Sequence, residues 1–230
     1  MVSGHSGSVA CGYGISLPSL ENVEEEDLFV VTTGDDFCIK GWKISINDGS
    51  IEESFTYKLP GRALVLDILI IPSDECRKDQ HWPLIVYGGD DGNTYIMSSA
   101  DGKEYNLTFK LSGHQDWITS LSFCIEGNSL WLLSCAKTED RSIVVWEAQE
   151  DSSSINKEKI WVEKTRLGEV GGNREGFFNC KFGPAGDKIV AVSYQGGLHL
   201  WHNENGSWVP QPVVSGHFDE VADISWDRTG

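Results

Sequence analysis

Apolar and small polar residues alternate in many short stretches of the chain. The alternation is clear from Trp117 to Phe123 and again from Val221 to Trp226. A period of two residues is typical of half-buried β-strands. No segment shows a sustained helical period of apolar residues. The pattern therefore predicts an all-β chain of short strands separated by turns.

A repeating unit is visible along the chain. Gly-His dipeptides occur at residues 4–5, 113–114 and 216–217. Apolar strand segments end at Trp42, Met97, Trp146 and Trp201, at intervals of 55, 49 and 55 residues. Six residues before these ends stand Asp36, Asp91, Asp140 and Gln195. Asp suits a tight turn because its side chain accepts backbone hydrogen bonds, so each unit is expected to contain a turn at this place.

These features resemble the WD40 repeat, whose units are the four-stranded blades of a β-propeller. The resemblance implies that a His, a Ser or Thr, the turn Asp and the Trp form a hydrogen-bonded set within one blade. The third unit matches with His114, Ser134, Asp140 and Trp146, and the first with His5, Thr32 or Thr33, Asp36 and Trp42. Met97 replaces the Trp in the second unit, and Gln195 stands at the turn of the fourth. We expect these two units to depend on apolar packing instead.

The repeat divides residues 1–230 into four complete blades and part of a fifth. Their expected boundaries lie near residues 1–60, 61–111, 112–167, 168–214 and 215–230. Seven blades of ~42 residues would need roughly 300 residues, so we expect a fragment, or a shortened gene product, of a longer propeller protein. Closure of a ring would cover sheet faces and edges that this chain leaves exposed. We therefore expect the isolated chain to aggregate or to fold only in part.

A narrower resemblance comes from four stretches, residues 165–173, 176–178, 197–201 and 215–219. They are similar to the Elongator complex protein 2 family, and the resemblance implies that the chain is part of the first propeller of such a protein. The resemblance implies a non-catalytic scaffold that supports modification of wobble uridines in transfer RNA. Its implied partners are the catalytic and the large scaffold subunits of Elongator, with transfer RNA contacted only indirectly or weakly. It further implies no cofactor and a place in the cytoplasm and the nucleus.

The charge balance narrows the possible partners. The formal net charge is −17, and binding of a polyanion over the whole surface needs clustered Lys and Arg. The locally basic stretch consists of Lys157, Lys159, Lys164, Arg166 and Arg174. It could contact RNA phosphate or an acidic partner, although a solvated outer strand is the interpretation we favour. The candidate interface residues are Lys164, Arg166, Arg174 and Trp161, and Trp82 and Trp208 are further aromatic candidates.

Catalytic and metal-binding motifs are not found in the sequence. The carboxylates at residues 35–36 and 90–91 could be calcium ligands or an acid–base pair, but no calcium-loop spacing follows either, and we favour a turn role. The glycine-rich stretch 168–176 lacks the Lys and Ser or Thr of a phosphate-binding loop. His199 and His202 are three residues apart and would point to opposite faces of a strand, so they cannot share one metal ion without distortion. The remaining alternatives are a WD40 adaptor of a signalling or ubiquitin-transfer complex and, less favoured, a propeller hydrolase that would need converging carboxylates.

No cysteine pair has the C-x-x-C spacing of common zinc and redox sites. No run of 18 or more apolar residues is present either, so the sequence predicts no membrane span. The expected site residues are therefore structural ones, with no catalytic, cofactor or metal site.

Overall fold

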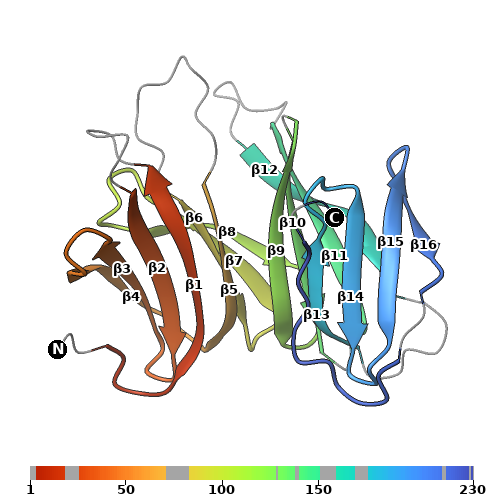
Figure 1. Cartoon of the computed structure of the whole chain (residues 1–230), viewed down its shortest axis with the longest axis horizontal. Coiled ribbons are helices and arrows are strands. Elements are labelled where there is room, and N and C mark those ends of the chain that lie inside the picture. Colours follow the sequence, from red (N-terminus) through yellow and green to blue (C-terminus); the bar gives the residue numbers. More distant parts are fainter. Residues whose placement is uncertain are drawn as a thin grey trace. The chain divides into compact units, whose positions relative to one another are not determined.

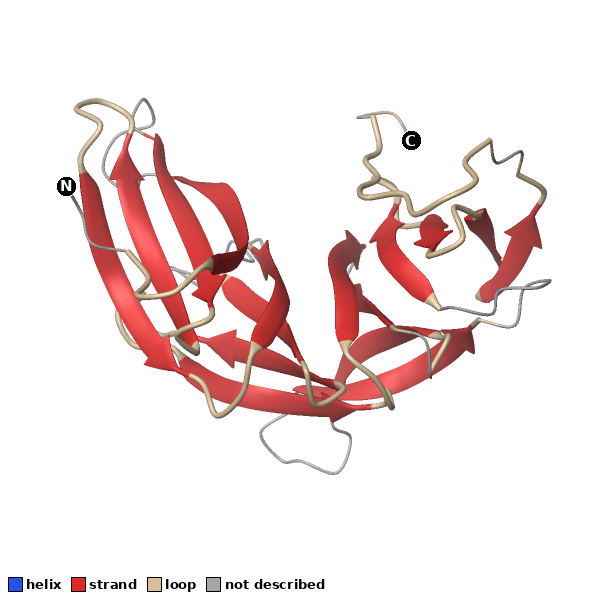
Figure 2. Cartoon of the chain, turned by 90° about the horizontal axis from the view of Figure 1, so that it is seen from below, coloured by secondary structure: helices blue, strands red, loops and turns tan. Residues whose placement is uncertain are grey.

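The structure is a computed structural model that describes residues 4–18, 26–70, 83–127, 129–137, 140–150, 159–168, 176–213, 216–227 and 229. Every regular element in this part of the chain is a strand (Figure 2). The strands form four antiparallel sheets of four strands each. The expectation of an all-β chain built from four-stranded blades is confirmed.

Each sheet is a simple meander, because its strands are neighbours in the order in which they follow along the chain (Figure 1). The first sheet contains β1 (Val9–Pro18), β2 (Glu26–Gly34), β3 (Cys38–Ser45) and β4 (Ile51–Lys58). The second contains β5 (Ala63–Leu69), β6 (Leu84–Gly89), β7 (Asn93–Ser98) and β8 (Asn106–Ser112). The third contains β9 (Ile118–Glu126), β10 (Ser129–Ala136), β11 (Ile143–Glu150) and β12 (Lys159–Leu167). The fourth contains β13 (Phe177–Phe182), β14 (Lys188–Ser193), β15 (Leu198–Glu204) and β16 (Ser207–Gln211).

The chain forms two compact units, the first made of residues 1–90 and 95–110 and the second of residues 91–94 and 111–230. The first unit holds the first sheet and most of the second. Its core contains Phe29, Val31, Ile39, Ile85 and Met97, all fully buried. Aromatic rings add to this core, with centroids 4.4 Å apart for Phe55 and Tyr105 and 4.8 Å apart for Tyr87 and Tyr95. Met97 therefore fills the place of the missing Trp by apolar packing, as the sequence predicts.

The second unit holds the third and fourth sheets, with β13 lying beside β9 and β10. Its core contains Leu133, Ile143, Phe177, Ile189 and Trp201. A hydrogen bond of 2.8 Å from Thr119 Oγ1 to the carbonyl of Phe177 joins the two sheets. Apolar side chains on alternate positions of each strand thus meet between two sheet faces, which is how such sheets bury their residues.

The segment of residues 216–227 follows the fourth sheet and has no assigned strand. Its sequence predicts the first strand of a further unit. A β-strand is defined by its ladder of hydrogen bonds to a neighbour, and the segment has no such ladder in the part of the chain that the structure describes. It lies instead as an extended chain against the fourth sheet, where Asn179 Nδ2 donates to Asp223 Oδ1 at 3.1 Å.

Candidate functional site

The first sheet brings together the four side chains that the WD40 pattern groups. His5 lies in the segment before β1, and its Nδ1 is 2.8 Å from Asp36 Oδ1. Its Nε2 is 2.8 Å from Thr32 Oγ1, which also accepts a hydrogen bond of 2.9 Å from Trp42 Nε1. The strand register explains the choice of Thr32. Val30 lies opposite Trp42 and Thr32 opposite Lys40, so Thr32 is the diagonal neighbour of Trp42 on the same face.

The turn carboxylate of this sheet also organises the backbone around it. Asp36 Oδ2 accepts a hydrogen bond from the backbone N–H of Ser6 at 2.9 Å, and its Oδ1 accepts one from Cys38 at 3.2 Å. Burial alone would raise the pKa of Asp36, but the hydrogen bonds from His5 and Ser6 outweigh it and lower the pKa overall. Asp36 therefore acts as an ionised turn acceptor, the role favoured from the sequence.

The third sheet repeats the set with a more buried geometry. His114 Nδ1 lies 3.0 Å from Asp140 Oδ2, and its Nε2 lies 2.8 Å from Ser134 Oγ. Trp146 Nε1 donates to the same hydroxyl at 2.9 Å. Because a carboxylate only accepts hydrogen bonds, Nδ1 of His114 carries a proton and donates it to Asp140. Both ring nitrogens of His114 and the indole nitrogen of Trp146 thereby have a hydrogen-bond partner.

Arg166 of β12 extends the set of the third sheet, a role that the sequence did not indicate. Its Nη2 donates to the carbonyl of Gly113 at 2.6 Å, and its Nη1 donates to Ser142 Oγ at 2.7 Å. Nη1 is also 3.5 Å from Asp140 Oδ1. Burial alone would raise the pKa of Asp140, but hydrogen bonds from His114 and Ser142 lower it to about 2. Arg166 thus covers an ionised carboxylate within the sheet.

The fourth sheet lacks the hydroxyl member of the set. Ile189 lies opposite Trp201 and Ala191 opposite His199, so Ala191 occupies the place that Ser134 has in the third sheet. His199 instead stacks on Trp201, with ring centroids 6.0 Å apart and an interplanar angle of 24°. Burial lowers the pKa of His199. The neutral imidazole therefore packs as a ring in this sheet, which agrees with the expectation of apolar packing.

Two candidate interface residues lie on β12 and are paired with carboxylates. Lys164 Nζ is 3.0 Å from Glu147 Oε2. Arg166 binds Glu163 through Nε at 3.0 Å and through Nη2 at 2.9 Å, besides its contacts to the third-sheet set. These pairs neutralise the charges of Lys164 and Arg166. RNA contact through Lys164 and Arg166 consequently gains no support from the geometry.

Trp161 and Trp208 are the aromatic interface candidates that lie among the described residues. Trp161 is half-buried, and its ring centroid is 6.4 Å from that of Phe123. Trp208 lies 6.2 Å from Phe182 in the same way. Both rings thus pack against neighbouring side chains. Arg174, Lys157 and Trp82 lie outside the described residues.

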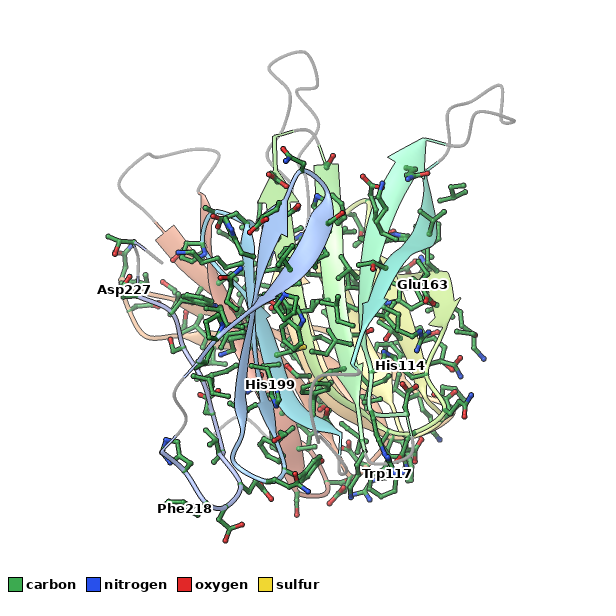
Figure 3. All side chains as sticks on the ribbon, turned by 90° about the vertical axis from the view of Figure 1, so that its right-hand side faces the viewer. His114, Trp117, Glu163, His199, Phe218 and Asp227 are labelled. Atoms are coloured by element: carbon green, nitrogen blue, oxygen red, sulfur yellow. The ribbon has the colours of Figure 1, made fainter. Side chains whose placement is uncertain are left out.

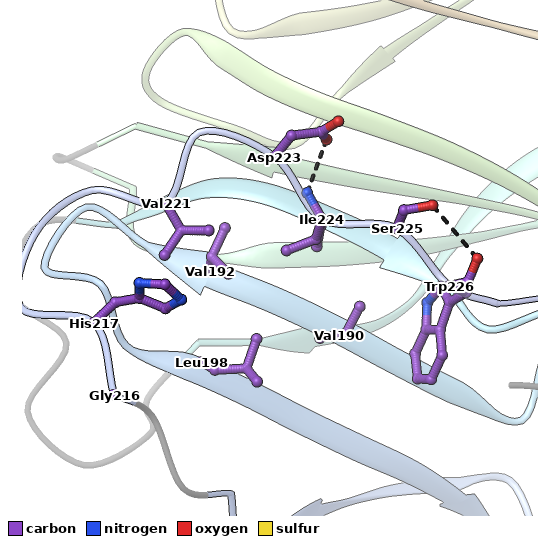
Figure 4. A pocket seen from close by; sticks show the side chains of 10 residues that line it. All are labelled: Val190, Val192, Leu198, Gly216, His217, Val221, Asp223, Ile224, Ser225 and Trp226. Carbon is purple, nitrogen blue, oxygen red and sulfur yellow. Dashed lines mark hydrogen bonds between the residues drawn. The ribbon is translucent and has the colours of Figure 1, made fainter.

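A hollow of about 430 Å³ lies between the fourth sheet and the segment of residues 216–226 (Figure 4). Its walls are mainly apolar and include Val190, Val192, Leu198, Val221, Ile224 and Trp226. The corresponding segment of the third sheet, which follows the Gly-His dipeptide at residues 113–114, explains the hollow. There Ile118 and Leu121 are buried beside β10, whereas their counterparts Val221 and Ile224 remain half-buried. The hollow is therefore the space beside an unpaired strand segment.

The described residues contain no cluster of three or more His, Cys, Asp or Glu side chains suited to a metal ion. Asp91 is at a turn, where its Oδ1 accepts a hydrogen bond of 3.1 Å from the backbone of Asn93. Within the same described ranges, no helix is long and apolar enough to cross a membrane.

Comparison with known proteins agrees with this geometry. A family model described as "WD domain, G-beta repeat" matches residues 105–147, which include the third-sheet set up to Trp146. Among solved structures, the fold is similar to Sqt1 from Chaetomium thermophilum, with a TM-score of 0.62 and 14% identity over 99% of this chain and 53% of that chain. It is also similar to the WD40 repeats of RRP9, with a TM-score of 0.54 and 16% identity over 90% of this chain and 52% of that one. At these identities the likeness shows the fold alone.

Sequence relatives are more specific. Elongator complex protein 2 of Danio rerio is 26% identical over 309 residues, which cover 99% of this chain and 35% of the relative. That alignment is longer than this chain of 230 residues, so the relative holds residues without a counterpart here. The human protein of the same name is 29% identical over 89% of this chain and 22% of its own length, and the Mus musculus protein is 38% identical over 52% and 15%.

The chain thus spans about a third or less of the length of these relatives. The sets around His5 and His114, the four-stranded sheets and the sequence relatives all lead to one conclusion. Residues 105–147 match the WD40 repeat, and along nearly its whole length the chain is similar to Elongator complex protein 2.

Proposed function

We propose that the chain is a non-catalytic scaffold of the Elongator complex. It would support modification of wobble uridines in transfer RNA by holding other subunits together. Its direct partners in this proposal are the catalytic subunit and the large scaffold subunit. The observation that carries the proposal is the similarity to Elongator complex protein 2 along 99% of the chain.

The geometry supports binding as the mechanism. The polar side chains that the repeat places inside the sheets bond to one another, as His114, Ser134 and Trp146 do. Asp36, which a hydrolase would need as a free carboxylate, accepts hydrogen bonds from His5 and two backbone N–H groups. Rigid sheets of this kind hold their connecting loops in place, and such loops are where binding residues gather.

Reconstitution with purified subunits tests the proposal. The chain is mixed with the catalytic and large scaffold subunits of the same organism and separated by size-exclusion chromatography. Co-elution with either subunit at micromolar concentration is the expected result. Elution of the folded chain apart from both subunits would refute the proposal. In that case an adaptor role in another complex becomes the better explanation.

The finer parts of the proposal need measurements in cells. Depletion of the protein should lower the fraction of modified wobble uridine in transfer RNA, as measured by mass spectrometry of nucleosides. The proposal includes residence in both cytoplasm and nucleus, which microscopy of a fluorescently tagged chain tests. An unchanged modification level after complete depletion would overturn the link to transfer RNA.

A further inference from the structure

One end of the second unit exposes two large aromatic side chains. Trp117 is 45% exposed and Phe218 is 99% exposed. Figure 3 shows both at the same end of the strands, below His114 in that view. A fully exposed Phe is uncommon on a surface that interacts only with water. This end of the unit is therefore a candidate binding surface.

The two aromatic residues stand in two copies of the same loop, each of which follows a Gly-His dipeptide. In the first copy Asp116 Oδ1 accepts a hydrogen bond of 2.7 Å from the backbone N–H of Trp117. In the second copy Asp219 Oδ1 accepts one of 2.8 Å from Glu220. Each loop thus fixes an aspartate beside its exposed end by the same local bond, so the carboxylates are held in place before any partner binds.

The turn between β14 and β15 lies against the second loop. Gly196 has a φ of +77°, and a Cβ at this residue would lie 2.4 Å from the carbonyl oxygen of Asp219, so the turn touches the second loop. Tyr194 in this turn packs edge-on against Phe178, with centroids 5.3 Å apart. Burial first, and then electrostatic interaction with Cys135, Glu220 and Asp116, raises the pKa of Tyr194 to about 12. The turn therefore places the Tyr194 ring beside the second loop.

These six residues, Asp116, Trp117, Tyr194, Phe218, Asp219 and Glu220, form what we call the aromatic–acidic rim. A cation already uses one of its rings, since Lys137 Nζ lies 5.0 Å from the centroid of Trp117. A guanidinium group stacks on aromatic faces and binds carboxylates through paired N–H donors. Three carboxylates would repel nucleic acid phosphate at the same place.

We propose that the aromatic–acidic rim binds an arginine-containing segment of a partner protein. The segment places guanidinium groups over the exposed rings and beside Asp219 and Glu220. The inference goes beyond the scaffold role, and it does not depend on which complex the chain belongs to.

The test uses the whole chain and a fluorescein-labelled nona-arginine peptide, with binding followed by fluorescence anisotropy at 0.15 M salt. Phe218→Ser and Trp117→Ser should each weaken binding about two- to fivefold, the range of a cation–π contact at an exposed site. Ile160→Ser is the matched control, because Ile160 is 39% exposed on β12 of the same unit. Equal affinity of wild type and both aromatic variants would overturn the proposal.

Charge needs its own control, since an acidic chain attracts any polycation. The double variant Asp219→Asn with Glu220→Gln should weaken binding about five- to tenfold. The double variant Asp187→Asn with Glu204→Gln also removes two negative charges, but at the opposite ends of the strands of the same unit. It should change the affinity less than twofold, because salt screens distant charges. An equal loss in the two double variants would mean nonspecific attraction and refute the site. A nona-lysine peptide should bind more weakly than nona-arginine, and equal binding would likewise contradict stacking on the rim.

Discussion

The hydroxyl of Ser134 is the centre of the hydrogen-bonded set in the third sheet, and its removal should destabilise the second unit strongly. The side chain is fully buried and bonds to both His114 Nε2 and Trp146 Nε1. Ser134→Ala therefore leaves two buried ring nitrogens without a partner. Each such loss costs ~1–3 kcal/mol, so the expected decrease in the free energy of unfolding for the two nitrogens is ~2–6 kcal/mol. Such a decrease is a large part of the 5–15 kcal/mol typical of a domain.

Urea unfolding followed by tryptophan fluorescence measures this decrease, because Trp146 itself reports on the third sheet. Ser134→Thr is the matched control, since the first sheet has Thr32 at the same place with the same two bonds. The Thr variant keeps the hydroxyl and should lose less than ~1.5 kcal/mol through its extra methyl group. A loss below ~0.5 kcal/mol in Ser134→Ala would refute the reasoning, because the ring nitrogens would then have found other partners at no cost.

Three further predictions concern the same unit. The pKa of Asp140 is lowered from 3.8 to about 2. Its ionised form therefore contributes about 2 kcal/mol to the free energy of unfolding above pH ~4, and this contribution is lost as the pH falls toward 2. Acid unfolding of Asp140→Asn should lack this component, and an acid transition equal to that of the wild type would contradict it. Arg166→Met should lower the free energy of unfolding by ~1–3 kcal/mol, because Ser142 and the carbonyl of Gly113 lose a charged donor. Lys164→Met is the control and should cost less than ~1 kcal/mol, because Lys164 forms a surface ion pair. Equal costs in urea unfolding would contradict a stabilising role of Arg166 in the third-sheet set. Gly196→Ala should lower the free energy of unfolding by more than ~1 kcal/mol, because φ is positive and the new Cβ would meet the loop at Asp219. Gly206→Ala, at a φ of +87°, would place its Cβ within 4 Å of nothing and should cost less. The melting temperatures of the two variants test this difference.

Several features of the fold could be predicted because they depend on residues close together in one sheet. Alternation with a period of two determines which side chains share a face, and the turn Asp lies a constant six residues before the Trp or its substitute. The resemblance to the WD40 repeat groups His114, Ser134, Asp140 and Trp146, and their distances confirm the set. The replacement of Trp by Met97 likewise indicated an apolar sheet, and Met97 is fully buried.

The choice between Thr32 and Thr33 needed the register. Both residues carry a hydroxyl, but only one can lie on the face of Trp42, and Val30 opposite Trp42 decides for Thr32. The contacts of Arg166 likewise could not be predicted from the sequence, because they depend on how β11 and β12 pair. The sequence grouped it with the basic stretch as an interface candidate, whereas the pairing of β11 with β12 places Val144 opposite Arg166 and brings its guanidinium to Asp140 and Gly113.

The sequence by itself determined the strands and the four sheets, because periodicity and turn spacing act within some fifty residues. Its resemblance to the WD40 repeat indicated the hydrogen-bonded set of the third sheet. Only the tertiary structure decided that the turn at Gly196 lies against Asp219, and that Arg166 reaches Asp140 and the carbonyl of Gly113. Such contacts join loops and strands that are far apart in the chain. Their formation depends on how the sheets pack and in which register their strands pair, and neither is encoded in the local pattern of apolar and polar residues.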